Sequence, residues 1–154
     1  MPNEPSFTQF GHDEAWEIGS TLVATFRAEH LPVTISIHLG EQRVFHAALP
    51  GTSADNDDWA MRKTRTVRRF DRSSHEVAQT YAADDPAKFY AGFGLSAADY
   101  AAAGGAVPIR VNNTLVGVLA ISGLASIDDH ERALAALQAA AGGSRRRAGA
   151  LRQP

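Results

Sequence analysis

Residues 33–49, VTISIHLGEQRVFHAAL, decide the fold class of this 154-residue chain. Val33, Ile35 and Ile37 alternate with polar residues, and a similar alternation returns after a turn near Gly40. An apolar side chain at every second position is typical of a strand with one buried face. The stretch therefore predicts a β-hairpin.

A second hairpin is predicted over residues 106–122, with its turn at Asn112-Asn113, a pair that tolerates left-handed backbone. Its second strand, from Leu115 to Ile121, is apolar on both faces, so we expect it to be central and covered on both sides. Phe7 and Phe10 make the N-terminal arm a candidate for a fifth strand at an edge of the sheet.

Helical spacing of apolar residues is found in three longer segments, over residues 13–30, 55–82 and 126–141. Ser73-Ser74 resembles a second capping signal inside the middle segment, so this helix either breaks there or continues to residue 82. Gly142-Gly143 is expected to end the last helix. Hairpins covered by separate helices predict an α+β fold with an antiparallel sheet of about five strands between helices.

The chain is predicted to form a single domain over residues 1–141, followed by an Arg-rich, disordered tail over residues 142–154. Without the four arginines of this tail, the chain has 11 cations against 17 acidic residues, which gives the rest of the protein a net charge of about −6. An acidic body argues against nucleic-acid binding. No apolar run is long enough to span a membrane, and residues 1–4 do not begin a secretory signal, so we expect a cytoplasmic protein with no membrane partner.

Composition and motifs exclude several kinds of site. The chain has no cysteine, which excludes disulfides, thiolate metal sites and cysteine nucleophiles. It also has no nucleophile elbow, no P-loop and no dinucleotide-binding fingerprint. Whether the protein is an enzyme stays open.

Lys63 is the most unusual residue in the expected helices, because it lies on the same face as Trp59 and Phe70. Burial lowers the pKa of a lysine unless an acid or a bound anion compensates. One interpretation is a site for a small anionic ligand, formed by Lys63 and Ser74 with Arg62 and Arg69 at its edge. The alternatives are a lysine whose stem packs while its ammonium reaches water, or arginines that pair with a neighbouring subunit.

His38 and His46 are predicted to share the face of the first hairpin opposite Ile37 and Phe45. Cross-strand histidines can bind a metal ion or ligate haem. No third ligand is visible in the sequence, so no metal site is established, and we favour two half-exposed strand histidines.

Three segments resemble the haem-degrading domain family of the GlcG/HbpS type, and more closely its small uncharacterised cytosolic branch. They are DWAMRKTRTVRRFDRSS at residues 58–74, GGAVPI at 104–109 and GVLAISGL at 117–124. The resemblance covers roughly residues 8–141. It implies a profilin-like α+β fold, a homo-oligomer built from dimers, and haem binding and breakdown. No haem-ligand motif of the family maps onto His38 or His46.

Three functional hypotheses follow. The first is a homo-oligomeric small-ligand-binding or interaction module, suggested by the absence of a catalytic constellation and by the ordered Arg/Lys surface. The second is a haem-binding or haem-degrading protein, which the resemblance implies. The third is a small-molecule enzyme with Lys63 in an anion pocket.

Overall fold

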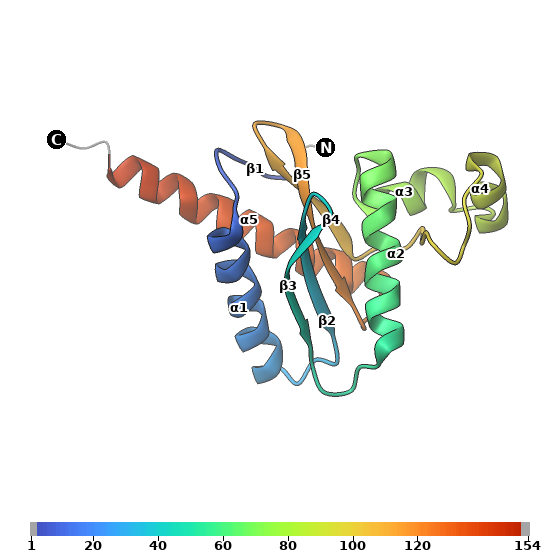
Figure 1. The fold of residues 1–154 in the computed structure, drawn as a ribbon, viewed down its shortest axis with the longest axis horizontal. Helices are drawn as coiled ribbons and strands as arrows, with labels where there is room; N and C mark the ends of the chain where they lie inside the picture. The colour runs from blue at the N-terminus through green and yellow to red at the C-terminus, as the bar shows by residue number, and fades with distance from the viewer. Residues whose placement is uncertain (1–2, 152–154) are drawn as a thin grey trace.

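A five-stranded sheet forms the centre of the molecule in the computed structural model, which describes residues 3–151 (Figure 1). The strand order is β1-β4-β5-β2-β3, and every neighbouring pair is antiparallel except β1 with β4. The strands are β1 (Ser6–Phe7), β2 (Thr34–Leu39), β3 (Gln42–Ala48), β4 (Ala106–Val111) and β5 (Thr114–Ser122). The predicted α+β class, both hairpins and the edge strand of the arm are therefore confirmed.

The register of both hairpins follows from local sequence. Asn112 and Asn113 take positive φ values of 48° and 64° at the turn between β4 and β5, as expected for a two-residue hairpin loop. In the first hairpin Ile37 lies opposite Phe45, and the register then shifts at a bulge so that His38 lies opposite Arg43.

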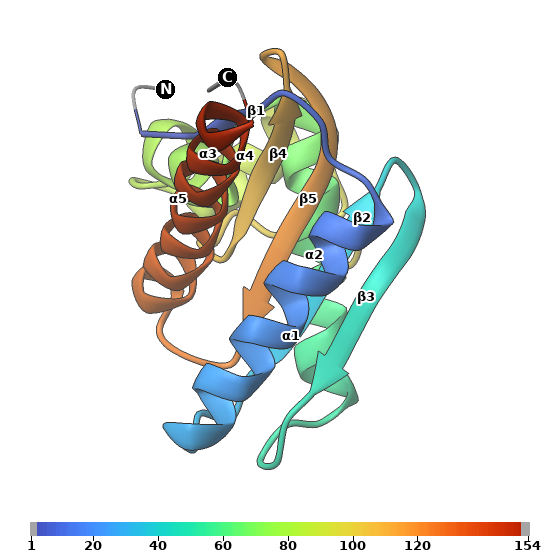
Figure 2. The ribbon, with the colours of Figure 1, turned by 90° about the vertical axis from the view of Figure 1, so that its left-hand side faces the viewer.

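Helices cover both faces of the sheet (Figure 1). On one face, α1 (His12–Ala28) lies over β2 and β3, and α5 (Ser126–Ala150) lies over β4 (Figure 2). On the other face α2 (Ala54–Phe70) packs against β4 and β5. Two short helices, α3 (Ser74–Tyr81) and α4 (Pro86–Phe93), follow α2.

The central strand β5 contributes to a core on each face. Leu119 and Ile121 belong to the larger apolar cluster, which includes Phe26 of α1 and Leu137 of α5. Val118 and Ala120 belong to a smaller cluster with Val67 of α2. The prediction of a strand buried on both faces is confirmed. Within the described residues, no helix combines the length and the apolar character that a membrane span requires.

The middle helical segment breaks, which settles the alternative that the sequence left open. Asp71 ends α2 in a left-handed conformation with φ 53°, and Ser73 then caps α3 by accepting a hydrogen bond from the Glu76 amide at 3.1 Å. Arg110 holds the break, because its guanidinium donates to the Asp71 carboxylate at 2.6 Å and to the Asp71 carbonyl oxygen at 2.9 Å. A single helix over 55–82 is therefore wrong.

The expectation that Gly142-Gly143 ends the last helix is also wrong, because α5 continues to Ala150. Alanine and arginine dominate this stretch and are strong helix formers, so two glycines are not enough to stop the helix. An exposed ion pair of 3.7 Å between Arg147 and Glu17 links this end of α5 to α1. Residues 152–154 of the expected disordered tail lie outside the described part of the chain.

Candidate functional site

Lys63 and Asp129 form a buried ion pair between α2 and the first turn of α5. Their side chains are 4% and 1% exposed, and the Lys63 ammonium donates to Asp129 Oδ2 at 3.2 Å. The same carboxylate accepts the amides of Gly123 and Leu124 at 3.3 and 3.0 Å. Burial lowers the pKa of Lys63 and raises the pKa of Asp129, while the attraction between the two charges opposes both shifts.

The sequence left open whether an acid, an anion or water meets the Lys63 charge. An acid of the same chain occupies that position, since Asp129 lies within hydrogen-bond distance and both side chains are shielded from solvent. This pairing was invisible in the sequence, because 66 residues separate the two partners.

Two glycines of the resemblance motif make room for this ion pair. Gly105 has φ +136°, and a Cβ at this position would lie 2.8 Å from Lys63 Nζ. A Cβ at Gly104 would lie 2.5 Å from the carbonyl oxygen of Ser126. The Gly-Gly motif therefore serves the close packing of this loop against Lys63 and the start of α5.

Two buried hydroxyl groups fix the same loop. Thr66 donates to the Ala101 carbonyl oxygen at 2.9 Å and accepts from the Ala101 amide at 3.2 Å. Ser74 accepts from the Ala106 amide at 3.0 Å, and its hydroxyl lies 3.3 Å from the Ala106 carbonyl oxygen. Ser74 was predicted as part of an anion site, and the structure places it at the start of α3, bound to β4.

The arginines of α2 are bound mainly within the chain. Arg62 donates to Asp58 at 2.8 Å and stacks over Trp59 with 3.9 Å to the ring centroid. Arg65 and Arg68 donate to the carbonyl oxygens of residues 99 and 40. Arg69 is exposed and has no hydrogen-bond or ion-pair partner among the described residues.

His38 and His46 share the α2 side of the first hairpin, as predicted, but they have different surroundings. His46 Nε2 lies 2.7 Å from a carboxylate oxygen of Asp57 in α2. His38 is buried, and its Nδ1 has no hydrogen-bond partner in the described structure. Burial lowers the pKa of His38 to about 4, with further contributions from Arg68 and Arg43. No group of three metal-ligating side chains was found in the part of the chain that the structure describes.

His75 and His130, which the sequence gave no reason to connect, stack on each other. Their ring centroids are 4.4 Å apart with an interplanar angle of 23°, which joins α3 to α5. Burial lowers the pKa of His130 to about 4, and the neighbouring His75 adds to the shift. No sequence pattern signals this contact, because it depends on how two distant helices pack.

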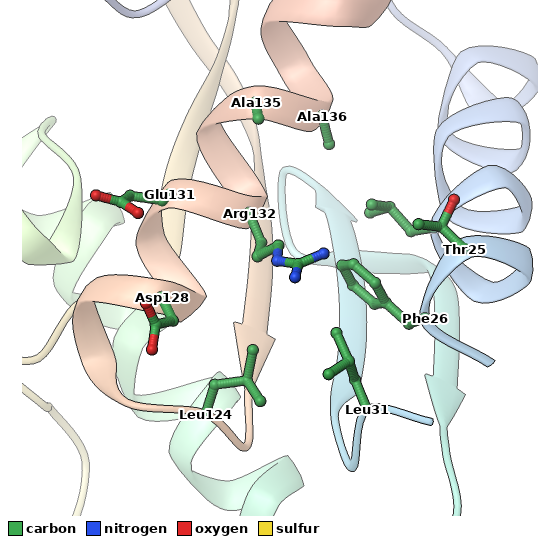
Figure 3. A pocket seen from close by; sticks show the side chains of 10 residues that line it. Thr25, Phe26, Leu31, Leu124, Asp128, Glu131, Arg132, Ala135 and Ala136 are labelled. Atoms are coloured by element: carbon green, nitrogen blue, oxygen red, sulfur yellow. The ribbon is translucent and has the colours of Figure 1, made fainter. Parts of the chain in front are cut away.

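Open space lies between α1 and α5, and we call it the α1–α5 groove. One part, the Phe26 cavity, has a volume of about 650 Å³, and Arg132 of α5 reaches toward Phe26 of α1 across it (Figure 3). The other part, the Phe7 cavity, has a volume of about 630 Å³ and lies between the N-terminal arm, α1 and the end of α5. Leu22 and Ala136 line both cavities, so the two adjoin each other and together make up the groove.

The groove has an apolar floor and a charged rim, as small-molecule sites commonly have. The floor of the Phe7 cavity includes Phe7, Ile18 and Leu22, while its rim carries Asp13, Glu14, Glu17 and Arg147. The rim of the Phe26 cavity carries Asp128, Glu131 and Arg132. The groove could not be predicted from sequence, because its walls come from the two ends of the chain.

The residues of the groove do not fit haem. Neither cavity has a histidine in its lining that could bind the iron. Among the described lining residues, carboxylates outnumber cations in both cavities, which disfavours the two propionate groups of haem. His38 is 4% exposed and so has no open face for a ligand of that size.

Comparison with known proteins gives consistent matches over most of the chain. The model of the family described as "Haem degrading protein HbpS-like" matches residues 10–138. A UPF0303 protein of Streptomyces coelicolor is 40% identical over 86% of this chain and 84% of its own length. A UPF0303 protein of Mesorhizobium japonicum is 42% identical over 80% and 74% of the two chains.

Solved structures share the fold. The Ybr137w protein has a TM-score of 0.81 and 29% identity, covering 90% of this chain and 83% of that one. The structure described as a PduOC:heme complex has a TM-score of 0.70 and 17% identity, with coverage of 84% and 94%. The family match, the UPF0303 relatives and the shared fold together show that this chain belongs to the HbpS-like haem-degrading protein family.

Proposed function

We propose that this protein is a homo-oligomeric, non-enzymatic module that binds a small ligand in the α1–α5 groove. The observation that carries the proposal is a pair of adjoining cavities of about 650 and 630 Å³ that share Leu22 and Ala136 in their linings. These volumes are in the range of small-molecule sites. The polar residues that suggested chemistry in the sequence, above all Lys63 and Ser74, are instead bound inside the fold.

Self-association is supported by exposed aromatic side chains. Trp16 is 64% exposed, and Trp59 is 37% exposed beside Arg62. Tryptophan and arginine are enriched at protein interfaces. Light scattering at micromolar concentration should give a mass well above the 16.4 kDa of one chain, whereas a mass near this value would contradict the homo-oligomer.

Ligand binding is tested with N-phenyl-1-naphthylamine, a neutral apolar dye that fluoresces when it leaves water. We expect wild-type protein to bind this dye. Ala136→Phe narrows both cavities where they meet, and Ala139→Phe narrows the Phe7 cavity, so each variant should weaken dye binding by about tenfold, or ~1.4 kcal/mol. Ala24→Phe is the matched control, because Ala24 is exposed on α1 and lines neither cavity. Absence of dye binding by the wild type would refute the groove as a ligand site.

Haem binding is the second candidate, supported by the family description and by the neighbour described as a heme complex. Titration of the purified protein with haemin separates the two candidates. A Soret shift that saturates at one equivalent and is lost in His38→Ala or His46→Ala would favour haem. Our proposal predicts no such saturable shift.

A further inference from the structure

The rim of the Phe7 cavity carries an excess of negative charge. Among the described residues, Asp13, Glu14 and Glu17 line this cavity together with a single cation, Arg147. The N-terminus of α1 adds roughly half a positive charge, which leaves about one and a half negative charges on the rim. Since the cavity floor is apolar, the site combines an apolar surface with an unbalanced anionic edge.

Arg147 indicates that the rim binds a cationic group. Its guanidinium lies 3.7 Å from the Glu17 carboxylate, and the two side chains are 76% and 60% exposed. Leu151, which is 87% exposed, lines the same cavity beside it. The end of α5 therefore presents a cation next to an apolar side chain, and such an exposed ion pair is weak enough to be displaced.

The three carboxylates differ in their availability. Glu14 already accepts the Gly11 amide at 2.8 Å as part of the N-terminal cap of α1. Among the described residues, Arg147 is the only partner of the Glu17 carboxylate, and Asp13 is exposed with no hydrogen-bond partner. Glu17 and Asp13 are therefore the carboxylates that can receive a ligand.

We propose that the groove selects a small amphiphilic cation, such as a primary alkylammonium ion. Its ammonium replaces Arg147 at Glu17 and also pairs with Asp13, and its apolar part covers Ile18, Leu22 and Ala136. This inference rests on the proposed function, since it assigns a ligand class to the same groove. A cavity of about 630 Å³ suits a small molecule better than a folded partner.

The test compares decylammonium with decanoate, which have equal chain length and opposite charge. Each is titrated against the protein loaded with N-phenyl-1-naphthylamine at pH 7. Decylammonium should displace the dye at a concentration about tenfold lower than decanoate, and added salt should reduce this preference. Glu17→Gln and Asp13→Asn should each reduce the preference severalfold. Glu41→Gln, at an exposed position in the turn of the first hairpin, should leave it unchanged.

Arg147→Ala provides an independent readout, because removal of the competing guanidinium should tighten decylammonium binding severalfold. Equal displacement by decanoate and decylammonium would overturn the charge selection, while dye binding itself would still support the groove. Failure of the wild type to bind the dye would overturn both proposals. Displacement by an arginine-rich amphipathic peptide at a lower concentration than decylammonium would overturn the assignment to a small molecule.

Discussion

The ammonium of Lys63 lies 3.2 Å from the carboxylate of Asp129, and both side chains are almost completely shielded from water. An isolated charge at either position would be strongly destabilising, so each residue requires the other. The pair ties α2 to α5 past the end of β5, at the loop that contains Gly104 and Gly105. Residues that carry the family resemblance thus form a buried polar junction between helices on opposite faces.

Removing either partner of the Lys63–Asp129 ion pair should destabilise the fold, and the losses from the two substitutions should not add up. Lys63→Met or Asp129→Asn alone should lower the free energy of unfolding by about 3–5 kcal/mol, because each leaves an uncompensated buried group. The double variant should lose clearly less than the sum of the two. Urea unfolding of all four proteins measures this coupling, and additive losses would show that the pair does not act as a unit.

Gly105→Ala should lower the free energy of unfolding by about 2 kcal/mol or more. A Cβ there would sit 2.8 Å from Lys63 Nζ, on backbone with φ +136°. Gly92→Ala in α4 is the matched control, because nothing lies within 4 Å of its Cβ position, and a helical Gly→Ala exchange gains up to about 1 kcal/mol. Equal stability of the two variants would contradict the tight packing described for this loop.

Acid should destabilise the fold through His38 and His130. Burial lowers the pKa of each from 6.5 to about 4, so the unfolded chain binds more protons between these values. The two buried, neutral histidines therefore cost the fold nothing above pH 6.5. As the pH falls from 6.5 toward 4, the free energy of unfolding decreases by up to about 1.4 kcal/mol per pH unit for each histidine. Urea midpoints at pH 7 and pH 5 should show a smaller loss in His38→Asn and His130→Asn than in wild type.

His12→Asn serves as the control for that experiment, since His12 is exposed at the start of α1. It should lose as much stability as the wild type between pH 7 and pH 5. If His38→Asn and His130→Asn do the same, the two buried histidines do not govern the acid sensitivity.

Arg69→Ala should loosen the proposed homo-oligomer. Arg69 is the exposed arginine of α2 without a partner among the described residues, so it is available to an acidic group of a neighbouring subunit. We expect the dissociation constant to rise severalfold at low salt and the difference to shrink at high salt. Lys88→Ala, which removes an exposed cation from α4, should leave the dissociation constant unchanged. Sedimentation profiles that respond equally to both substitutions would argue against a role of Arg69 in subunit pairing.

Most of the fold could be predicted from sequence because its signals are local. The alternation in residues 33–49 and the Asn112-Asn113 turn depend only on neighbours along the chain, and both hairpins were confirmed. The break in the helix after Phe70 could be predicted only in part from the sequence. Its capping signal is local, whereas Arg110, which holds the break, comes from a distant strand.

The candidate site was harder to predict because it depends on contacts between distant segments. Lys63 was correctly singled out as unusual, but its partner Asp129 looked like a helix-capping residue. The arginines of α2 were expected to need acids or a ligand, and the structure shows that backbone carbonyl oxygens meet Arg65 and Arg68. The groove itself exists only because α1 and α5 lie side by side on the sheet.

The α1–α5 groove can be tested as the binding site by photolabelling the wild-type protein with an alkylamine that carries a diazirine group, followed by mass spectrometry of the labelled peptides. If the alkylamine binds in the groove, labels should appear on α1 and α5 around Ile18, Leu22 and Ala136. Excess decylammonium should suppress this labelling. Labels concentrated on α2 or α3, or labels on α1 and α5 that decylammonium does not suppress, would contradict the α1–α5 groove as the binding site.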